Sequence, residues 1–255
     1  MNNKESADEL FHFTKEYRSI ISIMNNKFKP FFCIEDLSFM YKKDKNMTLA
    51  LPIVCFCDIP LERISIHKKK YGNYGIGLTK EWGMKNSLNI VNYSFPESYK
   101  SSSYRILIDS YDEFKTDLNG ENLDAFSNAF NILLMTSKPY EGKIFDKMNK
   151  KWLDSKVRFY NEREWRYLPL VDKLNWSISL EEHKGKYCDF FDAIEKEQPK
   201  IQDEYTLKFT VDDIKYIFLT DNSEIEKFIK DISGIYGVTE LQKIRNLIRI
   251  GKCTI

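Results

Sequence analysis

Two glutamates, Glu162 and Glu164, are the residues whose type and spacing most strongly suggest chemistry in this chain. They lie in the segment Tyr160–Tyr167 (YNEREWRY), whose alternation is typical of a strand. On a strand, side chains two residues apart point to the same face, about 7 Å from each other. Two like charges beside Trp165 are unfavourable unless solvent, a cation or a ligand stabilises them.

A carboxylate in a crevice can stabilise a positive charge that develops on a bound substrate. At ~4 Å and an effective dielectric constant of ~20, the attraction is about 4 kcal/mol, which corresponds to roughly a thousandfold in rate. That chemistry suits a sugar that passes through an oxocarbenium-like state, as in glycoside cleavage or cleavage of the nicotinamide–ribose bond. The alternative is an edge strand with both charges in water.

A second candidate pair lies near the amino end, on the expected short strand Leu10–Thr14. His12 and Thr14 are two residues apart, so both side chains can direct a hydrogen-bonding group at one ligand. A ribose diol is a natural recipient. A lone histidine on an apolar strand is also commonly a core residue with satisfied hydrogen bonds.

The glycine-punctuated segment Gly72–Leu78 (GNYGIGL) allows the backbone to approach a flat ligand closely. Tyr74 within it is a candidate for stacking on a ring. The pattern is neither a Rossmann nor a P-loop fingerprint. Upstream, Cys55 and Cys57 are expected to be buried, and no residue set nearby completes a metal site.

Composition limits the class of protein. The 255 residues carry a net charge of +1, which argues against a strongly basic nucleic-acid-binding surface. The cysteine count of five is odd, without a C-x-x-C pair, and the three histidines lack zinc-ligand spacing. The polar start Met1–Glu9 is unlike a signal peptide, and the longest apolar run, Leu49–Cys57, is too short to span a bilayer. We therefore expect a cytoplasmic protein without membrane association.

Helical and strand patterns mix without a regular βαβ rhythm, which predicts an α+β fold. No linker divides the chain, so we expect a single domain over residues 1–255. Lys143–Arg158 is interpreted as a basic connection and Leu180–Glu204 as a polar surface excursion. The other expected elements are helices at Tyr17–Met24, Leu61–Tyr71, Leu123–Leu134 and Leu241–Ile248, strands at Leu49–Asp58, Tyr205–Phe209 and Ile214–Thr220, and a helix capped by Ser223 with Glu226.

Five motifs follow one another along the chain: FHFT at 11–14, CFCDIPL at 55–61, HxxxYGNYGIGLTKEW at 67–82, KPYEG at 138–142 and EREWR at 162–166. Together and in this order, they resemble the AbiGi family of bacterial abortive-infection proteins. The resemblance implies a role in phage defence. It also implies a cognate partner, because the family is described as the antitoxin half of a two-gene system.

A more distant resemblance is to DarT-type and E-x-E mono-ADP-ribosyltransferases, which use NAD as a substrate. It implies an ADP-ribosyltransferase-like split β-sheet with flanking helices. Glu164 would stabilise the oxocarbenium ion and Glu162 would orient the acceptor. The opening arginine and the central Ser-Thr-Ser of the arginine-modifying class are both missing.

The same resemblance implies how NAD would be held. His12, Phe13 and Thr14 match the first-strand position that holds the ribose. Arg63 is the nearest candidate for the NAD phosphates, and Tyr74 is the candidate for stacking on nicotinamide.

Two functions from different classes remain. The first is an NAD-dependent mono-ADP-ribosyltransferase effector, whose macromolecular acceptor, protein or nucleic acid, the sequence leaves open. The second is a non-catalytic antitoxin or phage sensor that uses a degenerate transferase fold and docks through the acidic stretch Leu180–Glu204. A glycosidase that uses the paired glutamates is a third reading.

Overall fold

The computed structural model of the chain describes residues 7–41, 46–117, 120–146, 149–169 and 177–251. The strands are β1 (Glu9–Thr14), β2 (Phe31–Asp36), β3 (Thr48–Cys57), β4 (Tyr74–Thr79), β5 (Asn89–Ile90), β6 (Asn92–Ser94), β7 (Ser137–Pro139), β8 (Glu141–Asp146), β9 (Lys151–Arg158), β10 (Glu164–Tyr167), β11 (Ile178–Ser179), β12 (Ile214–Leu219) and β13 (Ile248–Ile250). The helices are α1 (Tyr17–Asn26), α2 (Ile64–Tyr71), α3 (Lys80–Lys85), α4 (Tyr99–Asp117), α5 (Gly120–Met135), α6 (Tyr187–Glu204), α7 (Glu224–Ile232) and α8 (Val238–Leu247), with short 3₁₀ turns η1 (Ser38–Met40), η2 (Leu61–Arg63), η3 (Phe159–Glu162) and η4 (Val211–Asp213).

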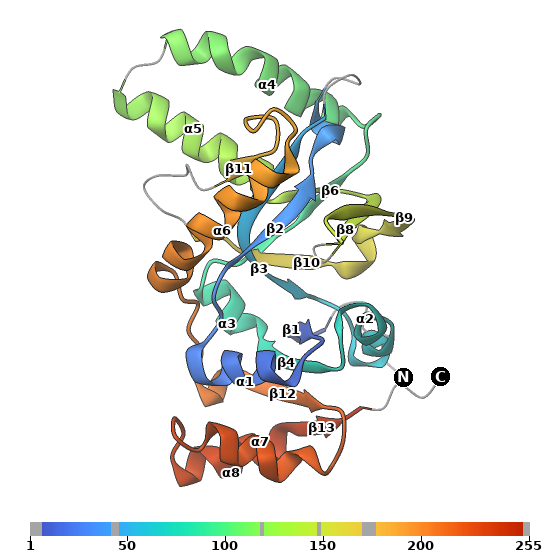
Figure 1. Cartoon of the computed structure of the whole chain (residues 1–255), viewed down its shortest axis with the longest axis vertical. Helices are drawn as coiled ribbons and strands as arrows, with labels where there is room; N and C mark the ends of the chain where they lie inside the picture. The colour runs from blue at the N-terminus through green and yellow to red at the C-terminus, as the bar shows by residue number, and fades with distance from the viewer. Residues whose placement is uncertain (1–6, 42–45, 118–119, 147–148, 170–176, 252–255) are drawn as a thin grey trace.

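The main sheet has the strand order β13-β12-β4-β1-β3-β10-β5 within the described residues, and β2 and β11 also pair with β3. Most of its neighbours are antiparallel, with β12 and β13 as the parallel pair. Helices flank the sheet rather than alternate with its strands (Figure 1). The α+β prediction is therefore confirmed.

The sheet opens between β1 and β3. β1 pairs with β4 over six positions but meets β3 at a single pair, Phe11 opposite Cys57. Beyond that pair β3 diverges and runs beside β2 over six further positions. In Figure 1, β1, β4, β12 and β13 accordingly lie in the lower half of the molecule, and β2, β3 and β10 lie above them.

The lower half is a closed apolar core. α1, α7 and α8 pack with β4 and β12, and Ile20, Met24, Ile217 and Phe228 are fully buried there. The amphipathic sequence of α7 explains its place, because Ile225, Phe228 and Ile232 are three and four residues apart and form one stripe.

The upper half contains elements that the sequence predictions missed. Leu180–Glu204 is not a surface excursion, because α6 packs on β2 and buries Phe190 and Ile201 completely. Pro199 within that charged segment hides the helical pattern, since proline normally disrupts a helix. Lys143–Arg158 is likewise not a simple connection, because most of it forms the hairpin of β8 and β9.

Three local predictions were also wrong. Within Tyr205–Phe209, Leu207 makes an isolated bridge to Phe28 instead of belonging to a strand. The Ser223 side chain does not cap α7. Instead, the Glu224 carboxylate accepts a hydrogen bond from the Thr220 N–H, at 3.1 Å. The third concerns Glu162, which lies in η3 and not on a strand. Among the described helices, none has the length and apolar character needed to cross a bilayer.

Candidate functional site

A cavity of about 800 Å³ lies where β1 and β3 separate. Four of the predicted catalytic and NAD-binding residues line it: His12 and Phe13 from β1, Glu162 from η3 and Glu164 from β10. The register explains how they meet, because Cys57 on β3 lies between Phe11 of β1 on one side and Glu164 of β10 on the other. The volume lies within the range of cavities that bind small molecules and cofactors.

The His12 imidazole occupies the opening between the strands. A continuous ladder would pair β1 backbone with β3 here; instead His12 Nδ1 lies 2.8 Å from the Cys55 carbonyl oxygen. Since a carbonyl can only accept, Nδ1 carries the proton and Nε2 is left as an acceptor. Burial lowers the pKa of His12 despite this hydrogen bond, so the ring is neutral at pH 7.

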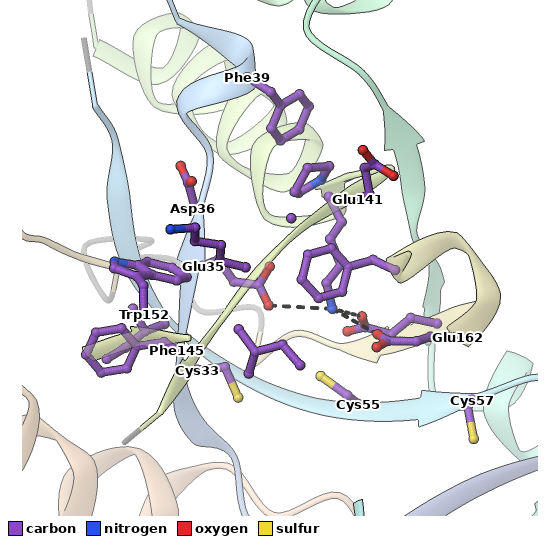
Figure 2. A pocket seen from close by; sticks show the side chains of 18 of the residues that line it. Cys33, Glu35, Asp36, Phe39, Cys55, Cys57, Glu141, Phe145, Trp152 and Glu162 are labelled. Carbon is purple, nitrogen blue, oxygen red and sulfur yellow. Dashed lines mark hydrogen bonds and ion pairs between the residues drawn. The ribbon is translucent and has the colours of Figure 1, made fainter. Parts of the chain in front are cut away.

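Glu162 and Glu164 approach each other through a turn instead of along a strand. Arg163 between them has φ of 44°, in the left-handed region, which ends η3 and starts β10. Both carboxylates then reach one ammonium: Lys138 Nζ lies 3.1 Å from Glu162 Oε2 and 2.7 Å from Glu164 Oε2. The expected pair therefore shares a cation. Figure 2 shows Glu162 and Glu35 at the wall of the cavity.

Arg166 is the second cation of the site, and its side chain is completely buried. Its Nε donates to Glu164 Oε1 at 2.6 Å, and its Nη1 donates to the Met135 carbonyl at 2.8 Å. Its Nη2 lies 3.1 Å from Glu35 Oε1, which is also 3.9 Å from Lys138 Nζ. Arg166 thus fixes the Glu164 carboxylate and, through Glu35, ties β10 to β2.

α2 provides a third cation and a phenol. Lys70 Nζ lies 2.5 Å from Glu162 Oε1, and the Tyr71 hydroxyl donates to the same oxygen. Burial, and then the Glu162 charge, raise the pKa of Tyr71, so it stays a donor. His67, one turn earlier, also lines the cavity.

The charges of this cluster balance. The carboxylates are Glu35, Glu162 and Glu164, and the cations are Lys70, Lys138 and Arg166.

The cations keep the glutamates ionised. Burial alone would raise the pKa of Glu164, but Arg166 and Lys138 outweigh it and hold that pKa well below its usual value. For Glu162, Lys138 and Lys70 likewise outweigh burial and lower the pKa. Both carboxylates therefore carry charge at neutral pH.

The cysteines at the cavity are unsuited to nucleophilic chemistry. The neighbouring Cys33 thiol and burial raise the pKa of Cys55 well above its usual value, and burial also raises that of Cys57. Thiols that stay protonated are poor nucleophiles and poor metal ligands. In the part of the chain that the structure describes, no group of three or more His, Cys, Asp or Glu is arranged to hold a metal ion.

Three predicted NAD-binding residues do not line the cavity: Thr14, Arg63 and Tyr74. Tyr74 is held on the side of α7, where its hydroxyl donates to Glu224 Oε1 at 2.7 Å and its ring meets Tyr17 edge-on. Arg63 is exposed at the end of η2. The structure therefore does not bring Tyr74 and Arg63, the residues predicted to contact nicotinamide and the NAD phosphates, into this cavity.

Sequence reasoning missed the cations that complete the site. Lys138 and Arg166 both stand inside the motifs KPYEG and EREWR, so their positions were visible although their pairing was not. Lys70 was seen only as part of a basic helix. No sequence pattern indicated a role for Glu35, because this residue reaches the site only through the pairing of β2 with β3.

Comparison with known proteins supports the motif resemblance. The family model described as "Putative abortive phage resistance protein AbiGi, antitoxin" matches residues 26–220. An abortive phage resistance protein AbiGi from Lactococcus lactis subsp. cremoris is 28% identical over 219 residues, which cover 80% of this chain and 87% of that protein. No solved structure matches the chain. Since the matched region, with its E-R-E-W-R motif and most of the cavity lining, spans well over half of the sequence, the chain belongs to the AbiGi family of abortive phage resistance proteins.

Proposed function

We propose that this AbiGi-family chain is a phage-defence effector that binds NAD in the split-sheet cavity and transfers its ADP-ribose to a macromolecule. One observation carries the proposal: Glu164 and His12, from separate strands, line the same cavity. A carboxylate and a neutral imidazole around one space are what an oxocarbenium-like ribose needs, a charge to stabilise it and an acceptor for its hydroxyl.

The roles follow from which atoms are already engaged. Arg166 Nε holds Glu164 Oε1 at 2.6 Å, whereas Oε2 is bound by Lys138 at 2.7 Å and more weakly by Arg166 Nη2 at 3.4 Å, so we assign Oε2 to the ribose. The Nδ1 of His12 is bound to the Cys55 carbonyl, so Nε2 accepts a hydrogen bond from a ribose hydroxyl. Glu162, whose Oε1 is held by Lys70 and Tyr71, orients the acceptor and takes its proton.

The transfer step balances without a further reactant. The bond between ribose C1′ and the nicotinamide nitrogen breaks, and its electron pair leaves with nicotinamide. Glu164 stabilises the cation that remains on the ribose. A nucleophile on the acceptor then bonds to C1′ and gives its proton to Glu162.

Nicotinamide release from NAD tests the proposal. The full chain is incubated with NAD and candidate acceptors, and Glu164→Gln is compared with Glu226→Gln, a matched change at an exposed position on α7. Glu164→Gln should reduce release at least about a hundredfold, on the scale of one preorganised electrostatic group. Glu226→Gln should change nothing. A wild-type chain that neither binds NAD nor releases nicotinamide contradicts the proposal.

A non-catalytic antitoxin or sensor is the second candidate. The observation that favours it is the complete pairing of both glutamates with Lys138, Lys70 and Arg166, which is also what a purely structural cluster would have. The word "antitoxin" in the family description agrees with it. Under this alternative, Glu164→Gln that still folds should protect cells against phage as well as the wild type and should retain any cognate toxin in a pull-down.

A further inference from the structure

One end of the cavity is built mainly from aromatic rings. His67 and Tyr71 of α2 lie with ring centroids 5.6 Å apart, and Phe159 of η3 and Phe13 of β1 line the cavity with them. We call these four residues the α2 end of the cavity. It adjoins the glutamates, because the Tyr71 hydroxyl donates to Glu162.

Phe159 in this group already interacts with two cations. Lys138 Nζ lies 4.5 Å and Lys70 Nζ 5.5 Å from its ring centroid. A ring that sits among these charges is better suited to packing against a neutral planar ligand than against a further cation.

His67 is the unexplained member of the group. Its side chain is 8% exposed, and Nε2 is closed to solvent without a hydrogen-bond partner among the described residues. Burial lowers the pKa of His67, although the Glu162 charge opposes this, so the ring is neutral at pH 7. Buried polar atoms in folded proteins are rarely left unpaired, and at a cavity wall a ligand can supply the partner that the described residues do not.

We propose that the α2 end of the cavity is a subsite for a neutral planar heteroaromatic ring with a hydrogen-bonding group at its edge, and that His67 reads that group. The ring packs against Phe13 and Phe159, and the His67 side chain turns so that Nε2, which is closed to solvent in this structure, bonds to the edge of the ring. The subsite rests on the proposed function in one respect: NAD carries two groups of this chemistry, nicotinamide and adenine. A ring held here leaves its ribose beside Glu162 and Glu164.

Fragment binding tests the subsite. Nicotinamide and adenosine are titrated separately into the full chain by calorimetry, and the binding of each is measured for the wild type, His67→Phe and His67→Gln. Phenylalanine keeps a flat ring without a polar edge, whereas glutamine restores a hydrogen-bonding group. For the fragment that binds here, His67→Phe should weaken affinity about five- to tenfold, as expected for one neutral hydrogen bond. His67→Gln should stay within about threefold of the wild type.

The two fragments separate the two sources of the ring. Loss for nicotinamide alone places the leaving group at the α2 end, and loss for adenosine alone places the far end of NAD there. Failure of both to bind, or equal affinity in the wild type and His67→Phe, overturns the subsite.

Stability provides the control for folding. Replacing an unpaired buried nitrogen by an apolar group does not remove a hydrogen bond, so the unfolding midpoint of His67→Phe should equal or exceed that of the wild type. His67→Leu, which is smaller, guards against crowding by the larger ring. If both variants unfold at lower denaturant than the wild type, His67 has a structural partner and the subsite is wrong.

The fragment-binding test of the subsite does not depend on whether the chain cleaves NAD. Fragments that bind through His67 in a chain that never cleaves NAD support the subsite and contradict the transferase. If the wild-type chain cleaves NAD and His67→Phe still binds both fragments with wild-type affinity, the transferase is supported and the subsite is contradicted.

Discussion

The two halves of the molecule place their buried residues differently. Around β4 and β12, the buried side chains are almost all apolar, from Ile20 on α1 to Ile244 on α8. Around β2, β3 and β10, a cavity adjoins a buried cluster of acids and bases that includes Glu164 and Arg166. β1 lies at the boundary, with Leu10 in the closed core and His12 in the cavity wall. The closed half, with its apolar core around β4 and β12, holds β1 in place. The open half, around β2, β3 and β10, uses His12 of that strand as part of its cavity wall.

The difference bears on function because buried ion pairs are a poor source of stability. The cost of desolvating two charges often equals or exceeds their attraction, and apolar side chains of similar volume are frequently as good. The closed half shows that this chain can build an apolar core. A charge cluster kept beside a cavity is therefore better explained by a bound ligand than by folding.

The largest effect that separates the halves should come from Arg166→Met. It removes one of the two cations that Glu164 and Glu35 share and leaves only Lys138 beside them, and removing one partner of a buried pair costs about 3 to 5 kcal/mol. Denaturant unfolding measures the loss. The double change with Glu164→Gln should recover part of it, because one stranded charge is removed. A loss below about 1 kcal/mol would show that the cluster is not dry.

Truncating one isoleucine in each half sharpens the comparison. Ile217→Ala, in the closed core at 0% exposure, should cost about 2 to 5 kcal/mol and leave the NAD affinity of the folded protein unchanged. Ile34→Ala, at the cavity wall and half-buried, should cost less and alter that affinity. Equal losses of stability, measured by urea unfolding, would contradict the distinction between the halves.

Lowering the pH should reduce the stability contributed by the charge cluster in the open half. The folded pKa values of Glu162 and Glu164 lie below their usual 4.5, so the unfolded chain binds more protons as pH falls. The stability they contribute is complete above about pH 4.5 and is lost as pH falls towards the folded values. Unfolding free energies between about pH 6 and pH 3 should fall less steeply for Glu162→Gln than for the wild type. Parallel slopes would mean that Glu162 is solvated.

The smallest effect is local to the closed half. The Thr210 hydroxyl donates to Asp213 Oδ2 at 2.8 Å, and the Thr210 N–H donates to the same oxygen at 2.7 Å. Thr210→Ala removes the first of these bonds at an exposed position and should cost about 1 kcal/mol. Nicotinamide release should be unaffected. A change in release would show that the two halves are coupled.

The sequence predicted the parts of the fold whose signals are local. The stripe at Tyr17–Met24 became α1, and the pattern at Leu123–Leu134 became part of α5. α6 was missed because its stripe is interrupted by Pro199 and diluted by charges.

The two paired glutamates of the site could be predicted from the sequence, but the lysines and the arginine that pair with them could not. Glu162 and Glu164 stood out by their spacing, yet their geometry depends on the left-handed Arg163, a conformation that sequence rarely reveals for a non-glycine residue. The pairing of Lys138 with both acids arises only when β7 and β10 are brought together by the rest of the sheet. The prediction that Tyr74 stacks on a ligand rested on its flanking glycines, but those glycines allow the close packing of β4 against β1.

A crystal structure of the full chain with a non-hydrolysable NAD analogue is the most direct measurement. The account predicts the analogue in the split between β1 and β3, with a ribose hydroxyl within hydrogen-bond distance of Glu164 Oε2 and another near His12 Nε2. An analogue bound elsewhere, or a cavity that stays empty at saturating analogue while Lys138 still bridges the two glutamates, would contradict it.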